Sequence, residues 1–186
     1  MSKLLRRPAV FPIGILLLLA LACSSGDADP AGPAAEGTAL LRVNPTGGST
    51  HVDPSAPLTV EFDHPLMPGM EGYALVHMGD LGGAPVPGQW VWSSDRSHMT
   101  FTPTAPLLPG TTYAIHLGGG MMDATGHPVD FHGHGFDMGG QWVTQGMMTG
   151  AGMMGGGFTH PMGSGWQGTG STYGMVFTFT TGGLSG

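Results

Sequence analysis

The segment at residues 99–117, MTFTPTAPLLPGTTYAIHL, decides the fold that this sequence predicts. At each end of the segment, apolar and polar side chains alternate, as they do in half-buried β-strands. Proline and glycine gather between the two ends, and these residues form turns but interrupt the hydrogen-bond ladder of a strand. We therefore predict two strands, at residues 99–102 and 112–117, joined by a turn.

The same pattern recurs on both sides of this segment. Five further alternating runs are separated by turn-forming residues, and they lie at residues 40–43, 58–62, 73–78, 89–93 and 175–180. In the run LTVEF, for example, Leu58, Val60 and Phe62 share one face. No part of the chain beyond the N-terminal apolar stretch shows a convincing helical period. About seven short strands separated by turns predict an all-β fold, an antiparallel β-sandwich.

Three more motifs accompany the first in a fixed order. NPTGGSTHVDPSAPLTVEFDHPL precedes it, and DATGHPVD and FTFTTG follow it. In this order the four motifs resemble bacterial Ig-like domains of the S-layer SbsA type, with His127 where that family usually has asparagine. The resemblance covers residues 40–128 and 175–182. It implies an Ig-like β-sandwich that serves as a structural or binding module and not as an enzyme.

Several residues in these motifs suggest structural roles. Tyr113 follows LLPGTT and looks like a tyrosine corner, in which the ring is buried while the hydroxyl bonds to the backbone of the turn. Asp123 and Gly126 fit a turn, with an Asx-type hydrogen bond from the aspartate and a positive φ at the glycine. Trp90 and Trp92 share one face of a strand. They either fill the core or form an exposed aromatic stripe for a glycan or a peptide, and the sequence leaves both open.

The N-terminal residues predict the location of the protein and are not part of the folded domain. Three basic residues precede an apolar stretch at residues 10–21, which is shorter than the roughly 20 residues of a membrane span and fits a secretory signal. It ends in LALAC, which resembles the lipobox of bacterial lipoproteins. That resemblance implies a signal peptide at residues 1–22, lipidation of Cys23 and a membrane anchor, and Ser24 after the cysteine favours the outer membrane of the cell envelope.

The chain beyond the signal peptide divides into a tether and one domain. Residues 23–38 are rich in alanine, glycine, proline and aspartate and predict a flexible tether, which leaves residues 39–186 as the domain. Cys23 is the only cysteine, so the chain forms no internal disulfide. From Cys23 onward two arginines stand against twelve acids, a net charge of −10 with neutral histidines. This acidity excludes nucleic acid as a partner, because phosphate binding needs cationic side chains.

Residues 131–174 form an insertion before the last predicted strand, where the family has a short connection. We expect the insertion to form a long loop at one end of the sandwich. Loops at the ends of sandwiches present binding residues, and a loop of this length is uncommon unless it is functional or disordered. Within it, GQWVTQ at residues 140–145 predicts a short strand, and Trp142 is expected to hold the loop to the body of the domain. If residues 132–134 were extended, both histidine rings would lie on one side.

The insertion is rich in metal-binding side chains. Thioether sulfur selects Cu(I), and imidazole suits Cu(II). The candidate ligands are His132, His134, Met138, Met147, Met148, Met153, Met154, His160 and Met162. Methionine is also a flexible apolar filler, and exposed methionines oxidise reversibly. A glycine-rich loop without a metal, or a sacrificial oxidant sink, therefore competes with copper as the interpretation. On the strands, we expect Met99 in the core and His116 on the solvated surface.

Two functional hypotheses follow. The first is a lipid-anchored, non-enzymatic Ig-like module of the cell envelope, at the outer membrane, with a binding, adhesion or structural role and an envelope protein or a glycan as partner. The second is a periplasmic or surface protein that binds or buffers Cu(I) or Cu(II) through the insertion. The sequence contains no GxSxG, phosphate-loop or HExxH motif, so we expect no enzyme.

Overall fold

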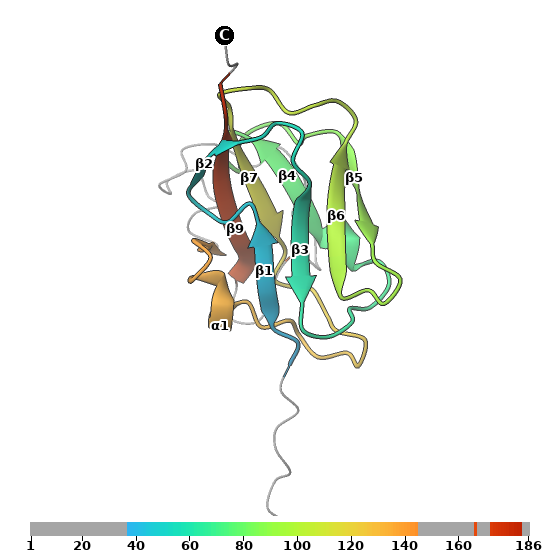
Figure 1. Cartoon of the computed structure of the whole chain (residues 1–186). Coiled ribbons are helices and arrows are strands. Elements are labelled where there is room, and N and C mark those ends of the chain that lie inside the picture. Colours follow the sequence, from blue (N-terminus) through green and yellow to red (C-terminus); the bar gives the residue numbers. More distant parts are fainter. Residues whose placement is uncertain (1–36, 145–165, 167–171, 184–186) are drawn as a thin grey trace, which may run out of the picture. The chain divides into compact units, whose positions relative to one another are not determined.

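The computed structural model describes residues 37–144, 166 and 172–183 (Figure 1). Two sheets face each other across an apolar core. The strands are β1 (Leu40–Asn44), β2 (Ser49–Val52), β3 (Leu58–Phe62), β4 (Ala74–Met78), β5 (Gly88–Trp92), β6 (His98–Pro103), β7 (Thr112–Leu117), β8 (Gln141–Thr144) and β9 (Thr172–Thr181). One sheet has the order β1-β3-β6-β5, and the other has the order β2-β9-β7-β4 with β8 paired to β9.

The predicted sandwich is confirmed, and each of the seven predicted strands is present. Neighbouring strands are antiparallel except β2 and β9, which pair in parallel with Ser49 opposite Phe179. Sequence analysis missed β2, because STHV contains a single aliphatic residue and β2 follows a glycine pair. β2 and β8 share one edge of β9, since β2 pairs with its C-terminal half and β8 with its N-terminal half.

The core forms where the inward faces of the two sheets meet. Val60, Met99, Ile115 and Phe177 are fully buried there and belong to one cluster. Burying a large apolar side chain contributes about 1.5–3 kcal/mol, so the alternating strands hold the fold together without a disulfide. The expectation that Met99 lies in the core is confirmed.

The tryptophans of β5 pack against this core. Trp90 and Trp92 are both partly buried; the ring centroid of Trp90 lies 5.2 Å from that of Phe101, and the centroid of Trp92 lies 6.1 Å from that of Phe62. This packing favours the core role that the sequence left open. An exposed aromatic stripe for a glycan is therefore not what these two side chains form.

Helical structure within the described residues is limited to two short turns. η1 (Met70–Tyr73) is a 3₁₀ turn before β4, and α1 (His132–Gly135) is one α-helical turn at the start of the insertion. None of the helices described is long and apolar enough to cross a membrane.

The described parts of the insertion are integrated into the domain. The expected short strand is present as β8, and the last strand begins at Thr172, three residues before the predicted start. Phe131 belongs to the core, with 2% of its surface exposed. Trp142 packs against the core and meets Phe131 edge to face, at a centroid distance of 6.3 Å. The simple picture of a loop at one end of the sandwich is therefore wrong for these parts.

Candidate functional site

A tyrosine fixes the long connection between β6 and β7. Tyr113 is buried on β7, and its hydroxyl accepts a hydrogen bond of 2.7 Å from the backbone N–H of Leu108. The Tyr113 ring stacks on Phe179 at a centroid distance of 5.7 Å. The Thr181 hydroxyl donates a bond of 2.6 Å to the Leu108 carbonyl, so both backbone groups of Leu108 are held. This part of the connection is therefore tied to β7 and β9.

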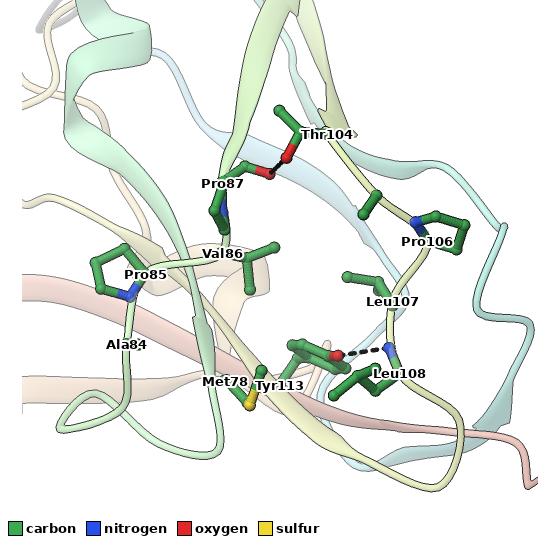
Figure 2. A pocket seen from close by; sticks show the side chains of 11 residues that line it. Met78, Ala84, Pro85, Val86, Pro87, Thr104, Pro106, Leu107, Leu108 and Tyr113 are labelled. Carbon is green, nitrogen blue, oxygen red and sulfur yellow. Dashed lines mark hydrogen bonds between the residues drawn. The ribbon is translucent and has the colours of Figure 1, made fainter.

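The held connection forms one wall of an apolar pocket of about 450 Å³ (Figure 2). The segment between β4 and β5 forms the opposite wall. The lining residues are Met78, Ala84, Pro85, Val86, Pro87, Thr104, Ala105, Pro106, Leu107, Leu108 and Tyr113. None of these side chains is charged. Met78 and Leu108 are 41% and 53% exposed, so the pocket opens to solvent beside two large apolar side chains.

The polar groups around the pocket are largely bonded to the protein. The carbonyl of Pro87 accepts hydrogen bonds from both the backbone N–H and the hydroxyl of Thr104, at 2.9 and 3.2 Å. With few polar groups available, the pocket suits an apolar group. Sequence analysis missed this site. A usable signal exists, because the two walls come from the similar runs APVPG at residues 84–88 and APLLPG at residues 105–110.

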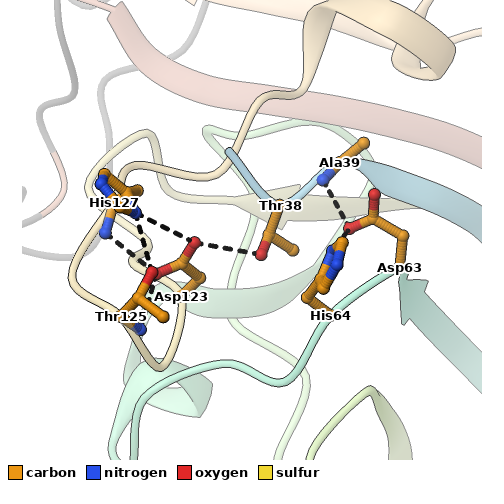
Figure 3. A network of polar contacts seen from close by, with 7 residues as sticks. All are labelled: Thr38, Ala39, Asp63, His64, Asp123, Thr125 and His127. Carbon is orange, nitrogen blue, oxygen red and sulfur yellow. Dashed lines mark hydrogen bonds and ion pairs between the residues drawn. The ribbon is translucent and has the colours of Figure 1, made fainter. Parts of the chain in front are cut away.

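A second cluster surrounds the buried carboxylate of Asp123 (Figure 3). Its Oδ1 atom accepts hydrogen bonds from the N–H of Thr125 at 2.8 Å, the Thr125 hydroxyl at 2.6 Å and the N–H of His127 at 2.9 Å. The Thr38 hydroxyl donates to Oδ2 at 3.3 Å. Gly126 completes the turn at φ 88°, a conformation that favours glycine.

These hydrogen bonds set the charge of Asp123. Burial alone raises the pKa of a carboxyl, but the bonds from Thr125, His127 and Thr38 outweigh it and hold the pKa of Asp123 well below its usual range. The carboxylate therefore links the turn to the segment that enters β1. Nearby, Asp63 accepts a bond of 2.8 Å from the N–H of Ala39 (Figure 3), which holds the same segment a second time. The cluster acts as a structural clamp.

Three candidate metal ligands fall within the described residues. His132 and His134 are exposed on α1. Residues 132–135 are helical, so they do not take the extended arrangement that would place both rings on one side. Side chains two apart on a helix point to different sides. Met138 is partly buried against the core, and its sulfur accepts a hydrogen bond of 3.1 Å from the N–H of Val43. The structure thus does not gather these three ligands at one point.

The other candidates lie outside the described residues. They are Met147, Met148, Met153, Met154, His160 and Met162, and the predicted lipidation site Cys23 lies outside them as well. Within the ranges that the structure describes, no group of three or more His, Cys, Asp or Glu side chains is placed to hold a metal ion.

The outer face of the β9-β7-β4 sheet carries a buried histidine pair. His77 and His116 are fully buried, with ring centroids 6.3 Å apart. His77 donates to the Gly83 carbonyl at 3.2 Å and His116 to the Tyr173 carbonyl at 2.8 Å. The prediction of a solvated His116 is therefore wrong, because this face is covered. Trp166, from the insertion, lies against His116 at a centroid distance of 5.0 Å.

Comparison with solved structures finds a copper resistance protein and a surface layer protein among the matches. PcoC, a methionine-rich copper resistance protein from Escherichia coli, is 18% identical over 78% of this chain and 98% of its own, with a TM-score of 0.45. CopC from Methylosinus trichosporium OB3b is 15% identical over 51% of this chain and 95% of its own, with a TM-score of 0.37.

Domains 1–6 of the surface layer protein SbsC are 17% identical over 52% of this chain, with a TM-score of 0.38. That match spans only 13% of the SbsC chain. No curated protein matches the sequence.

The sequence model of the bacterial Ig-like domain matches residues 35–134. This range runs from the segment before β1 to α1, so it includes both walls of the pocket and the Asp123 turn. It also exceeds half of the 186 residues. This chain is a member of the bacterial Ig-like domain family.

Proposed function

We propose that the protein is a lipid-anchored, non-enzymatic module of the bacterial cell envelope that binds an apolar side chain of a protein partner. The observation that carries the binding role is the pocket between the two proline-rich walls. Its lining is uncharged, several of its polar groups are bonded internally, and two exposed apolar side chains flank its mouth. A glycan would need several free hydrogen-bonding groups, which these walls do not offer, so a protein side chain fits better.

The proposed location in the cell envelope rests on the N-terminal sequence. LALAC, at residues 19–23, places a single cysteine where a bacterial lipoprotein is lipidated. Expression with a clickable fatty acid should label the wild-type chain and place it in the outer-membrane fraction. The Cys23→Ala variant should lose the label and leave that fraction. A wild-type chain that is unlabelled and soluble would contradict the proposed anchor.

The pocket is tested with two small probes, N-acetyl-leucine amide and N-acetyl-phenylalanine amide. The mature chain with Cys23→Ser, which avoids detergent, should show saturable NMR shifts of the Met78 methyl group with at least one probe. Leu108→Asp should abolish them, because a carboxylate at the mouth opposes apolar burial. Leu41→Asp is the matched control, since Leu41 is also an exposed leucine, at 44%, but does not line the pocket. Shifts that are absent, or equal in both variants, would contradict the pocket role.

Copper binding is a second candidate function. The structural observation on its side is the exposure of both imidazoles of α1. The structure also shows how to test it, because deleting residues 131–174 would remove the buried Phe131 and all of β8. Five Met→Leu substitutions, at Met147, Met148, Met153, Met154 and Met162, preserve size and remove the sulfur ligands. An anaerobic Cu(I) titration should then show at least tenfold weaker binding. Equal and weak binding by both chains would end the copper hypothesis.

A further inference from the structure

The edges of the two sheets differ in how they are covered. The free side of β1 is occupied by residues 130–138, since Leu40 N–H donates to the Asp130 carbonyl at 3.2 Å and Val43 N–H donates to the Met138 sulfur. The free side of β4 is occupied as well. Met78 N–H donates to the Ala84 carbonyl at 3.0 Å, and the Val76 carbonyl accepts from the next connection. Both strands therefore have bonded partners on each side.

β5 lies at the outer margin of its sheet and has one paired side among the described residues (Figure 1). Hydrogen bonds from Ser93 N–H to the His98 carbonyl and from Thr104 N–H to the Pro87 carbonyl fix its register on β6. In an antiparallel pair, the alternate residues direct their N–H and C=O groups away from the partner. Here these residues are Gly88, Trp90 and Trp92. A row of backbone donors and acceptors therefore lies along the outer side of β5.

The sequence of β5 lacks the features that normally protect such an edge. GQWVW contains no charged residue and no proline, and its pairing with β6 has no bulge. Val91 is 57% exposed on the outer face. Proteins usually block an exposed edge with lysine, proline, a bulge or a covering segment, because open backbone groups pair with other chains. β5 is thus suited to receive a further strand.

A groove runs beside this edge, between β5 and β4. It has a volume of about 240 Å³, and its lining residues are Glu71, Gly72, Ala74, Leu75, Val76, Val86, Gly88, Trp90 and Phe101. An added strand directs alternate side chains to the two faces of the sheet. Side chains on its inner face would therefore enter this groove and meet apolar walls.

One charge lies in the groove. The Glu71 carboxylate is partly buried, and its Oε2 atom accepts a hydrogen bond of 2.7 Å from the indole N–H of Trp92. An ionised carboxylate retains further acceptor capacity. The other lining residues are uncharged. A cation on a bound partner segment would meet Glu71. A second copy of this chain that paired through its own β5 would bring no cation to Glu71, because β5 contains no charged residue.

We propose that β5 binds an extended segment of a protein partner by strand addition, with apolar residues at alternate positions and a lysine or arginine that meets Glu71. Main-chain hydrogen bonds to Gly88, Trp90 and Trp92 supply affinity, and the groove and Glu71 supply selectivity. The groove shares only Val86 with the lining of the proline-walled pocket, and strand pairing to β5 does not depend on that pocket.

The test uses the full lipidated chain in nanodiscs and a synthetic nine-residue peptide, TVTVTKTVT, in which the valines and the lysine alternate with threonine and therefore lie on one face. Hydrogen exchange measured by mass spectrometry should slow at least tenfold in the segment 88–92 when the peptide is bound. The matched control peptide carries N-methyl groups at alternate residues, which removes the donors needed for strand pairing and keeps the side chains. This control should give no protection. Absent protection, or equal protection by both peptides, would overturn the proposal.

The Glu71→Gln variant tests the charge. It keeps an acceptor for Trp92, so the fold is retained, and it should bind the lysine peptide about fivefold more weakly, as expected for a partly exposed ion pair. A peptide with norleucine in place of lysine should bind both chains equally. Equal affinity of the two chains for the lysine peptide would overturn the role of Glu71. Protection of residues 88–92 that grows with protein concentration alone would make a second copy the occupant and overturn the proposed partner.

Discussion

The backbone N–H of Leu108 and the hydroxyl of Tyr113 are joined by a hydrogen bond of 2.7 Å. The bond crosses from the β6–β7 connection to the buried start of β7. It holds one wall of the proline-lined pocket at a fixed distance from the core. The same residue, Tyr113, also lines the floor of the pocket (Figure 2), so stability and the shape of the site depend on one side chain.

Replacing Tyr113 with phenylalanine should destabilise the fold by about 1 kcal/mol. The ring stays buried, but the partly buried N–H of Leu108 loses its acceptor, and the loss of one such hydrogen bond carries this cost. Urea unfolding at pH 7 measures the change. Thr102→Val, at an exposed position of β6, is the control and should change stability by less than about 0.5 kcal/mol. A Tyr113→Phe variant as stable as the wild type would show that the bond contributes nothing.

Asp123→Asn should remove a pH-dependent part of the stability. The pKa of Asp123 is lowered in the folded state, so its contribution is complete above the unfolded value of about 3.9 and is lost as pH falls through the folded value. The variant should be less stable than the wild type by about 2 kcal/mol at pH 7, typical of hydrogen bonds to a charged group. The gap should narrow as the solution becomes strongly acidic.

Urea titrations between pH 7 and pH 2 measure the Asp123 effect. Asp137→Asn is the matched control, because Asp137 is exposed on the segment after α1. A constant gap between the wild type and Asp123→Asn across this range would contradict the assigned role of the carboxylate.

His77 should make the domain less stable as the solution becomes mildly acidic. Burial lowers the pKa of His77, and the bond to Gly83 and the charge of Asp80 offset this only in part. The unfolded chain therefore binds a proton first, so stability is full above the unfolded pKa of about 6.5 and falls as pH drops toward the folded value. Arg42 and Arg96, the only described cations of fixed charge, are not among the groups that shift this pKa.

Urea unfolding at pH 8 and pH 5 measures this dependence. His77→Gln retains a side-chain amide that can donate to Gly83, and it should flatten the decrease between the two pH values. The exposed His98→Gln variant is the control and should keep the decrease. An undiminished decrease in His77→Gln would assign the dependence to another group.

The strands were predictable because apolar alternation reports burial on one face of a sheet. LTVEF and TYAIHL specify β3 and β7 to the residue. His116 shows the limit of this method, since alternation places it on the outer face but cannot tell that the insertion covers that face. The pocket was missed for a related reason. Its walls come from two different connections, and the register of β5 on β6 brings Pro87 beside Thr104.

Adding a methyl group at Gly118 should displace the insertion from the outer face. A Cβ atom there would lie 2.7 Å from the Cε3 atom of Trp166 and 3.1 Å from the Cβ atom of Tyr73. Such overpacking costs about 1–3 kcal/mol. Gly118→Ala should therefore lower stability and shift the emission of Trp166 to longer wavelength as its ring leaves His116. The Trp166 signal is obtained by subtracting the spectrum of Trp166→Phe.

Gly72→Ala is the matched control for this last change. Gly72 lies in η1, and a Cβ atom there would meet nothing within 4 Å. Its emission spectrum should equal that of the wild type. If Gly118→Ala also left both emission and stability unchanged, Trp166 would not rest on Gly118 and His116 in solution. The burial of His116 on the outer face would then need another explanation, because the ring of Trp166 lies against the ring of His116.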